Sequence, residues 1–483
     1  MNESLYPVYT RFPNELGSRI SYGENHPERQ ACYAKLETAK RKGFSLERLD
    51  FVTQFVDDEV NPSRECPEAS VRYLGLEGIQ PNTGKAVYEF MVGKDIHSVS
   101  KRLHRGDIVF SGLRPYLNKC HIVDVQESLG STELFVMVPE EDKVVPGFLF
   151  RYLLSDLVLQ QTKWVLTGSS YPRLGIDDFK GLTLVLPTKE NQVAILSKIL
   201  PLENQIADKE AEAKQLTEEG RGIILKEIGL PVSTEEMKSY FFKAGAELHS
   251  LWFSVPAAEL KDRLHYLFYH PKHSYLGELN KKYKATILGL ACREPICLGE
   301  QVKEDENGTE VLLKTANLKN DYIDFENATP ISKETFEANP SAQAHKGDIL
   351  LAATGYVSMG KVDIYERLTP ALVDGQISII RLNDAYNPYF MTYLLRSHLG
   401  QLQIEKWWIG SSGQIHLPPG DIEKFIIVSC ESVSQKEQTQ IADRITEKLR
   451  KAHELSAEAK AKREEARQLF EQLVLGTGNS LSS

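Results

Sequence analysis

The sequence lacks the features that mark secreted, zinc-binding or membrane-spanning proteins. Its six cysteines are scattered, and Cys292 and Cys297 have no second Cys or His pair that would complete a zinc site. No apolar run approaches the roughly 20 residues needed to cross a bilayer. Residues 1–11 show no apolar core followed by a small-residue cleavage site, so no secretory signal is visible. These absences predict a cytoplasmic protein with reduced thiols and no membrane partner.

A surplus of positive charge is also missing. With 57 basic and 67 acidic residues among 483, the formal charge is −10, and the hydrophobic content of 41% is that of an ordinary globular protein. Counterion release needs clustered Lys and Arg, so this balance argues against strong, unaided binding to nucleic acid. It does not exclude DNA, because a net charge hides local clusters and a second subunit can supply phosphate contacts.

Catalytic motifs are missing as well. Residues 78–85 have five residues between two glycines, where a phosphate-binding loop needs four, and Ala86 replaces the hydroxyl that would bind magnesium. Residues 387–390 lack the second proline of the Asn-Pro-Pro-Tyr loop of amino-methyltransferases. The Ser-containing loops 168–170 and 410–412 are not nucleophile elbows, and the histidines form no His-Glu-x-x-His set. We therefore expect a protein that binds and positions, with no catalytic residues and no metal site.

What the sequence does contain is an internal repeat. His104-Arg105-Gly106-Asp107-Ile108 returns as His345-Lys346-Gly347-Asp348-Ile349, an offset of 241. Three further matches keep the same order at offsets of 241 to 248: Tyr152-Leu153-Leu154 with Tyr393-Leu394-Leu395, Gly168-Ser169-Ser170 with Gly410-Ser411-Ser412, and Gln192-Val193-Ala194 with Gln440-Ile441-Ala442. A period this long predicts a duplicated domain. Two similar modules on one chain suggest a protein that reads two similar things at a fixed separation.

Each copy mixes strands and helices. Short β-branched and aromatic runs between Gly, Pro and Asn predict strands at 107–110, 134–138, 182–186, 311–313, 348–351, 377–382 and 425–428. Helices that begin at a proline are predicted over 146–159 and 388–402, and a further helical stretch over 28–42. This pattern favours the α+β class, with two similar mixed α/β modules.

Each copy also ends in a long charged helix. A 3-4 spacing, apolar at all but three lysines, runs through Ile199, Leu202, Ile206, Lys209, Ala213 and Leu216, and through Ile441, Ile445, Lys448, Ala452, Leu455, Ala459, Lys462, Ala466, Leu469 and Leu473. This spacing asks for a partner helix, and the alanines allow close approach. We expect an antiparallel coiled coil of the two helices; the alternative is two surface helices packed on their own modules. Pro201 predicts a kink or a later start of the first helix.

The predicted domain boundaries follow from these features. They are an N-terminal module over 1–189 with a leader over 1–60, a central long helix over 190–230, a linker and C-terminal module over 231–433, and a distal long helix over 434–478. Residues 434–475 carry 9 Lys or Arg and 8 Asp or Glu, which indicates a solvated helix face rather than a nucleic-acid arm.

The repeated motifs resemble the target recognition domains of specificity subunits in Type I restriction-modification systems. The His-Arg/Lys-Gly-Asp-Ile strand, the proline-opened helix with Tyr-Leu-Leu, the Gly-Ser-Ser loop and the closing strand before a Gln-started helix all look like that family. Residues 262–271 also look like its opening segment, and the resemblance covers about residues 60–475. It implies two target recognition domains that each contact half of an asymmetric bipartite DNA sequence, separated by the coiled coil.

The resemblance also implies partners and cofactors. Methyltransferase subunits, two of them, would pack on the helices, and restriction subunits with nuclease and translocase activity would join them on double-stranded DNA. S-adenosylmethionine, ATP and Mg would be bound by those partners and no cofactor by this chain. Two alternatives stay open: a protein-binding scaffold that uses the same modules for a non-DNA ligand, and a nuclease or methyltransferase.

A local basic island marks the candidate DNA contacts of the first module. Residues 101–119 carry five Lys or Arg beside the single acidic Asp107 and a turn over 112–115. Arginine favours guanine and asparagine favours adenine, so Arg114 and Asn118 are candidate base readers; the alternative is a solvated basic loop. The predicted contacts are Arg102, Arg105, Arg114, Tyr116, Asn118, Lys119, Ser169, Ser170, Tyr171 and Arg173.

The matching loops of the second module give a different set. The predicted contacts are Lys314, Asn317, Lys319, Thr354, Tyr356, Ser358, Lys361, Ser411, Ser412, Gln414 and His416. Gln414 is expected to pair with adenine and Lys361 with phosphate. Because the loops differ between the copies, we expect two different half-sites. Trp407 and Trp408 are expected to pack into the module core or a domain junction.

Overall fold

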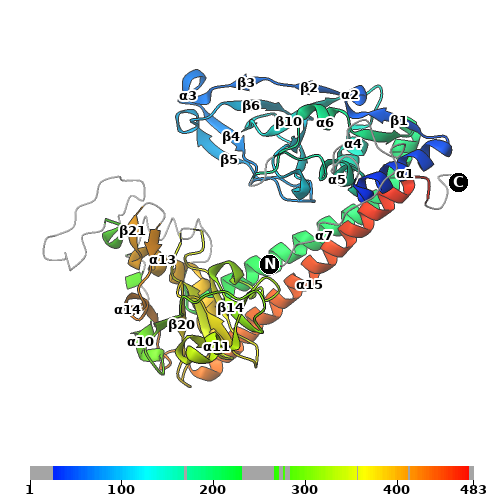
Figure 1. Cartoon of the computed structure of the whole chain (residues 1–483). Coiled ribbons are helices and arrows are strands. Elements are labelled where there is room, and N and C mark those ends of the chain that lie inside the picture. The colour runs from blue at the N-terminus through cyan, green and yellow to red at the C-terminus, as the bar shows by residue number, and fades with distance from the viewer. Residues whose placement is uncertain are drawn as a thin grey trace. The chain divides into compact units, whose positions relative to one another are not determined.

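The computed structural model describes residues 26–167, 171–230, 266–270, 273, 276–277, 283–355, 357–411 and 414–477. The chain divides into two compact units, Met1–Glu210 with Ala457–Ser483 and Ala211–Ser456 (Figure 1). Each unit contains one mixed module together with a part of each long helix. Among the described residues, no helix is both long and apolar enough to cross a membrane.

The first unit contains a five-stranded, a four-stranded and a two-stranded sheet. The five-stranded sheet has the order β3 (Glu59–Val60), β6 (Ser100–His104), β9 (Glu127–Ser131), β4 (Ser70–Leu74) and β5 (Glu89–Val92). The four-stranded sheet has the order β2 (Thr53–Val56), β10 (Leu134–Pro139), β7 (Ile108–Ser111) and β8 (Cys120–Ile122). In the third, β1 (Ser45–Arg48) pairs antiparallel with β11 (Thr183–Leu186).

The helices of the first unit are α1 (Pro27–Arg41), α2 (Leu49–Val52), α3 (Pro62–Glu65), α4 (Pro146–Leu153), α5 (Asp156–Thr162) and α6 (Ile176–Lys180). Of these, α2, α4 and α6 pack against strands of the four-stranded sheet. The buried rings of Phe110 and Phe179 stack 4.7 Å apart in the core between them. The helix predicted over 146–159 is two helices, because the chain turns at Ser155, whose hydroxyl donates to the Tyr152 carbonyl at 2.6 Å. The predicted stretch over 28–42 is confirmed as α1.

The second unit is built from the matching elements. One four-stranded sheet has the order β13 (Cys297–Leu298), β20 (Ile377–Ile380), β17 (Ile349–Ala352) and β18 (Val362–Ile364). The other has the order β15 (Thr329–Ile331), β14 (Glu310–Leu313), β19 (Ala371–Val373) and β16 (Gln343–Ala344). Two pairs follow, β12 (Ala285–Ile287) with β23 (Ile426–Val428) and β21 (Ile409–Ser411) with β22 (Gln414–His416). The helices are α10 (Leu288–Ala291), α11 (Lys333–Ala338), α12 (Pro388–Arg396), α13 (His398–Trp407) and α14 (Pro419–Ile422).

The two modules share one topology. The order β2-β10-β7-β8 matches β13-β20-β17-β18, and the parallel pair β4–β9 matches the parallel pair β14–β19. A side-chain clamp repeats as well: Gln161 bonds both the N–H and the carbonyl of Thr183, and Gln403 does the same for Ile426. The predicted duplication and the α+β class are therefore confirmed.

Two sequence-based assignments need correction. Residues 45–60, which we placed in a leader, form β1, α2, β2 and β3 of the first module, because β1 pairs with β11 and β2 with β10. The matched helix starts are Gln192 and Gln438 rather than Gln440. The Gln192 amide accepts from the Val145 N–H and donates to the Pro187 carbonyl, and the Gln438 amide binds the N–H of 387 and the carbonyl of 433 in the same way.

The long helices are α7 (Lys189–Glu227) and α15 (Gln435–Val474), which run side by side in Figure 1. In the first unit Lys209 pairs with Glu458 and Arg463 with Glu210. In the second, the partners are Lys451 with Glu212, Lys448 with Glu219 and Arg444 with Glu227, at 2.6–3.2 Å. In the second unit the residue numbers rise along α7 while they fall along α15, so the helices are antiparallel. Pro201 lies inside α7 and does not delay its start.

A seven-residue repeat lines the buried seam of both helices. Every seventh residue is buried, namely Ile199, Ile206, Ala213 and Gly220 on α7 and Ile445, Ala452, Ala459, Ala466 and Leu473 on α15. The intervening predicted positions, Leu202, Leu216, Leu455 and Leu469, are half-buried, and Ile441 is buried. This pattern is that of a coiled coil, and the small residues allow close approach. The predicted antiparallel coiled coil is confirmed.

Candidate nucleic-acid interface

Two loops that are far apart in the sequence meet in each module. In the first, the loop after β7 joins the loop before α6: Leu113 and Arg173 form a β-bridge, and the Arg114 N–H donates to the Pro172 carbonyl at 2.8 Å. In the second, Thr354 forms a β-bridge with His416, and the Leu417 N–H donates to the Ala353 carbonyl at 2.8 Å. We call the described residues of 112–119 with 171–174, and of 353–361 with 414–417, the paired loops.

Arg114 and Tyr171 form the exposed part of the first paired loops. The Arg114 backbone has φ of 48°, a left-handed conformation that costs a non-glycine residue about 1–3 kcal/mol. Its guanidinium lies over the Tyr171 ring, 5.5 Å from the centroid, and this ring is 59% exposed. Tyr116, at the next position but one, is 42% exposed. The strained backbone thus presents one guanidinium beside an exposed phenol ring, and a second exposed phenol follows two residues along the chain.

Asn118 and Lys119 make internal contacts instead. Asn118 is 1% exposed, has φ of 48°, and its amide donates to the Leu154 carbonyl at 3.0 Å. The Lys119 ammonium donates to the Leu76 carbonyl at 2.5 Å. In this conformation, the amide that we expected to read adenine lies inside the protein, where it holds the loop on the end of α4. The structure therefore corrects that expectation for Asn118.

Two of the predicted arginines, Arg102 of the basic island and Arg173 outside it, pair with carboxylates. Arg102 lies 3.6 Å from Asp58 and 3.3 Å from Glu65, and Arg173 binds both carboxylate oxygens of Glu133 at 2.8–3.3 Å. The hydrogen bond with Glu133 raises the pKa of Arg173. Arg105 is exposed in the turn that follows β6. Arg105 and Arg114 are thus the predicted arginines for which no carboxylate contact is seen in the described part of the chain.

The second paired loops carry different side chains. Gly355 and Gly360 have φ of 86° and 83°, and the Met359 N–H donates to the Gly355 carbonyl at 2.8 Å, which closes a tight turn. Ser358 and Lys361 lie half-buried on this turn. Thr354 and His416 lie across the bridge from each other, and Ser411 and Gln414 belong to the β21–β22 hairpin. Ser169, Ser170, Tyr356 and Ser412 lie outside the described residues.

Lys314, Asn317 and Lys319 lie on a separate turn after β14. Asn317 is 3% exposed, and its side chain closes the turn by accepting from the Lys314 N–H and donating to the Asp324 carbonyl, at 2.8 and 2.9 Å. Lys314 pairs with Glu304, and Lys319 lies 3.6 Å from Asp324. The structure gives Asn317 a role in shaping the turn and places all three outside the paired loops.

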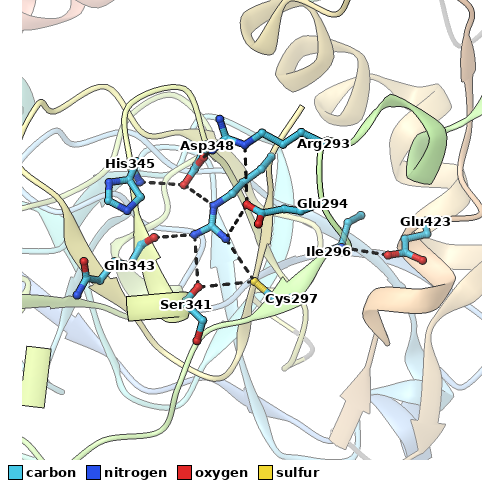
Figure 2. Close-up of polar contacts among 10 residues, drawn as sticks. Arg293, Glu294, Ile296, Cys297, Ser341, Gln343, His345, Asp348 and Glu423 are labelled. Atoms are coloured by element: carbon cyan, nitrogen blue, oxygen red, sulfur yellow. Dashed lines mark hydrogen bonds and ion pairs between the residues drawn. The ribbon is translucent and has the colours of Figure 1, made fainter. Parts of the chain in front are cut away.

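In each module the aspartate of the repeated Gly-Asp motif closes a tight turn, over residues 104–107 and 345–348. Asp348 accepts from the His345 N–H at 2.8 Å, as Asp107 does from the His104 N–H. Figure 2 shows His345 and Asp348 of the second copy. There the buried Arg381 guanidinium binds Asp348 at 3.1 Å. Burial raises the pKa of the Asp107 carboxyl.

Arg381 joins several strands of the second module. It donates to the Gln343 carbonyl at 2.7 Å and to the Ser341 carbonyl at 3.4 Å, and it lies 3.3 Å from Glu294. The sequence motif identified the aspartates, but it gave no signal for Arg381. Trp407 and Trp408 pack against the hydrophobic core of the second module, as expected.

These features define a class of protein: a duplicated α+β chain in which each copy presents paired loops and both copies end in a shared antiparallel helix pair. Over 118 residues, 23% of this chain, the sequence is 32% identical to the Type I restriction enzyme HindI specificity subunit of Haemophilus influenzae (strain Rd). The chain spans about a quarter of that relative, 26% of its length. No family model matches. This relative confirms the resemblance to specificity subunits of Type I restriction-modification systems.

Solved structures of similar proteins cover most of the chain at low identity. The HsdS subunit from Thermoanaerobacter tengcongensis is 18% identical, with 90% of this chain and 97% of that chain covered and a TM-score of 0.36. The S subunit of a Type-I restriction-modification system from M. genitalium is 13% identical, with 89% and 96% covered and a TM-score of 0.41. Identities and TM-scores this low carry no argument about the fold, so the fold of each module is described from its own strand order.

Proposed function

We propose that this chain is the DNA sequence-specificity subunit of a Type I restriction-modification complex. Each module would read one half of an asymmetric bipartite target. The observation that carries the proposal is the meeting of two sequence-distant loops at the same place in both modules. The name of the relative that matches over 118 residues supports it. Loops on a rigid sheet are a common location for binding residues, because the sheet fixes their geometry while their side chains vary.

The two paired loops would read different bases. In the first module, Arg114 has the geometry to donate two hydrogen bonds to the O6 and N7 atoms of guanine, with Tyr116 and Tyr171 beside it. The second paired loops would instead offer the hydroxyl groups of Thr354 and Ser358, the imidazole of His416 and the ammonium of Lys361. Different donors on the same scaffold would give an asymmetric site.

The chemistry would belong to other subunits. Methyltransferase subunits, two of them, would bind along the coiled coil and hold S-adenosylmethionine, and restriction subunits would hold ATP and Mg. This chain would be non-catalytic and would bind no cofactor itself. It would supply the choice of sequence, and the acidic balance of the chain would be offset by phosphate contacts from these partners.

Mapping of methylated adenines tests the proposal. DNA from cells that carry the chain with its methyltransferase partner should show methylation at one asymmetric bipartite motif, and cells that lack the chain should not. Methylation that is independent of the chain, or a single palindromic motif, would contradict it.

The non-DNA scaffold is the alternative, and a mobility shift separates the two. The chain with its methyltransferase partner should shift duplex DNA that contains the mapped motif. A complex that assembles with the partner but shifts no duplex would favour the scaffold.

A further inference from the structure

A tight turn in each module connects the paired loops to the long helices. In the first module it spans residues 79–86, the stretch that superficially resembles a phosphate-binding loop. Ile79 and Ala86 form a β-bridge, and the Gln80 N–H donates to the Lys85 carbonyl at 2.9 Å. In the second module it spans residues 318–323, with a bridge between Leu318 and Ile323. We call these two segments the strut turns.

On one side, the first strut turn holds the base of the first paired loops. The Asn82 N–H donates to the Asn118 carbonyl at 3.2 Å, and the Gly84 carbonyl contacts the His121 imidazole at 2.9 Å. The turn also packs on α4, since a Cβ at Gly84 would lie 2.3 Å from the Phe150 ring. Hydrogen bonds therefore connect the first strut turn directly to the 112–119 loop and to β8.

On its other side, the first strut turn contacts the helix pair through charge. Lys85 pairs with Glu210 of α7, and Glu210 also pairs with Arg463 of α15. A cavity lined by Asn82, Thr83, Phe150, Glu203 and Ile206 lies beside these ions. Because the space next to the contact is open, the ion pairs rather than close packing connect the turn tip to the helices.

The second strut turn makes the same two connections with different residues. Asp363 of β18, the strand that follows the second paired loop, accepts from the N–H groups of Lys319 and Asn320 at 2.8 and 3.0 Å. The Asn320 side chain accepts from the Val362 N–H at 2.8 Å. Arg396 of α12 pairs with Asp363 and fixes it in place.

Its helix contacts again reach both long helices. Asp321 lies 3.7 Å from Arg221 of α7, and the Tyr322 ring lies 6.0 Å from the His453 ring of α15. None of these side chains matches Lys85, Glu210 or Arg463 in type and position. Both modules thus connect a strut turn to the long helices, but they use different residues to do so. The feature shared by the two copies is the position of the turn and not a particular ion pair.

We propose that the strut turns set the orientation of the paired loops of each module on the coiled coil. In this way they would fix the length of the DNA spacer between the two half-sites that the subunit accepts. The inference rests on the proposed function. Lys85, Glu210, Arg221 and Asp321 act as positioning residues: they touch no base, and they decide which face of the duplex the loops meet.

Site selection from a random DNA pool tests the inference with the full chain in complex with its methyltransferase partner. Lys85→Ala and Asp321→Ala should each lower discrimination against spacers one base pair too long or too short by about two- to fivefold, the range of an exposed ion pair. Preferred bases in both half-sites should stay unchanged. Lys94→Ala is the matched control, because Lys94 pairs with Glu68 at 3.8 Å within the same module and contacts neither long helix.

A charge exchange separates positioning from loss of folding. Arg221→Glu alone should relax the spacer preference, and adding Asp321→Lys should restore it. Unchanged spacer preference in all single variants would overturn the inference, as would a change in the preferred bases, which would make the turns base readers. If the unaltered complex selects no bipartite site, the proposed function fails first and the inference with it.

Discussion

At the scale of single residues, the environment of each arginine decides what it is available to do. Arg102 and Arg173 bind carboxylates, whereas Arg114 stacks on an exposed tyrosine from a left-handed backbone position. The sequence predicted the basic island around Arg114. It did not predict that Arg102 and Arg173 pair with carboxylates, because Glu65 and Glu133 lie about 40 residues away from them along the chain.

Arg114→Ala is expected to relax the first half-site and leave the second unchanged. Loss of a bidentate contact to guanine costs about 1–3 kcal/mol of discrimination. Site selection with the assembled complex measures this. Arg102→Ala removes the same charge from a residue that is already paired, so its effect should be smaller. A uniform loss on all sequences would mark Arg114 as a phosphate contact instead.

Arg381→Met is expected to destabilise the second module by about 3 kcal/mol, the lower end for breaking a buried ion pair, since Arg293 remains 3.7 Å from Asp348. The replacement leaves the Asp348 carboxylate buried with less compensation. Urea unfolding of the full chain, followed by fluorescence, measures the loss. Asp107→Asn in the matching motif is the comparison, because an amide oxygen still accepts from the His104 N–H; an equal loss in both variants would count against this account.

At the scale of elements, hydrophobic pattern and turn chemistry predicted both long helices and seven of the strands, β7, β10, β11, β14, β17, β20 and β23. The coiled coil could be predicted because the residues that a helix buries against a partner helix recur at a fixed spacing in the sequence. Breaks within helices were not predicted. The chain turns at Ser155 and again at Ser397, where each hydroxyl donates to a carbonyl three residues earlier, and serine is too common for this to be a signal.

The helix pair should lose stability in acid. The hydrogen bond from Lys448 holds the pKa of Glu219 below its ordinary value of 4.5, and Lys209 does the same for Glu458. A lowered pKa in the folded state stabilises above pH 4.5 and loses this effect as the pH falls through the folded value.

Thermal unfolding followed by circular dichroism checks this for the chain and a Lys209→Met, Lys448→Met variant. The variant should melt at a lower temperature at pH 7, and the difference should shrink as the pH falls below 4.5. Burial raises the pKa of Asp363 to about 6, which gives the opposite trend, but both proteins share it, so the difference isolates the helix pair. A difference that stays constant as the pH falls below 4.5 would assign it to packing of the lysine stems.

At the scale of the whole molecule, the duplication was visible in a few short motifs, but the extent of each module was not. Residues 45–60 read as a polar leader because the partner of β1, β11, lies more than a hundred residues further along. Long-range pairing of this kind leaves no local pattern in a strand of four residues. Paired loops are a similar case: each loop was predicted separately, and only the fold brings them together.

Shortening both long helices by one heptad should change the spacer and keep the half-sites. Removing residues 213–219 and 448–454 preserves the seven-residue repeat and removes Lys448 together with Glu219. Seven residues rise about 10.5 Å at 1.5 Å each, which corresponds to about three base pairs. Mapping the methylated motif measures this. An altered half-site with the original spacer would refute the role of the helices as a ruler.

The first unit takes Ala457–Ser483 from the far end of the chain, and Phe470, Leu473 and Val474 are part of its core. During translation, the ribosome makes residues 26–210 early, yet this core stays incomplete until α15 has emerged. The second unit, which ends at Ser456, has all its residues sooner. The half that is synthesised first is therefore the half that can finish folding last, and its apolar surface has to wait in the nascent chain for the whole of the other module to be made.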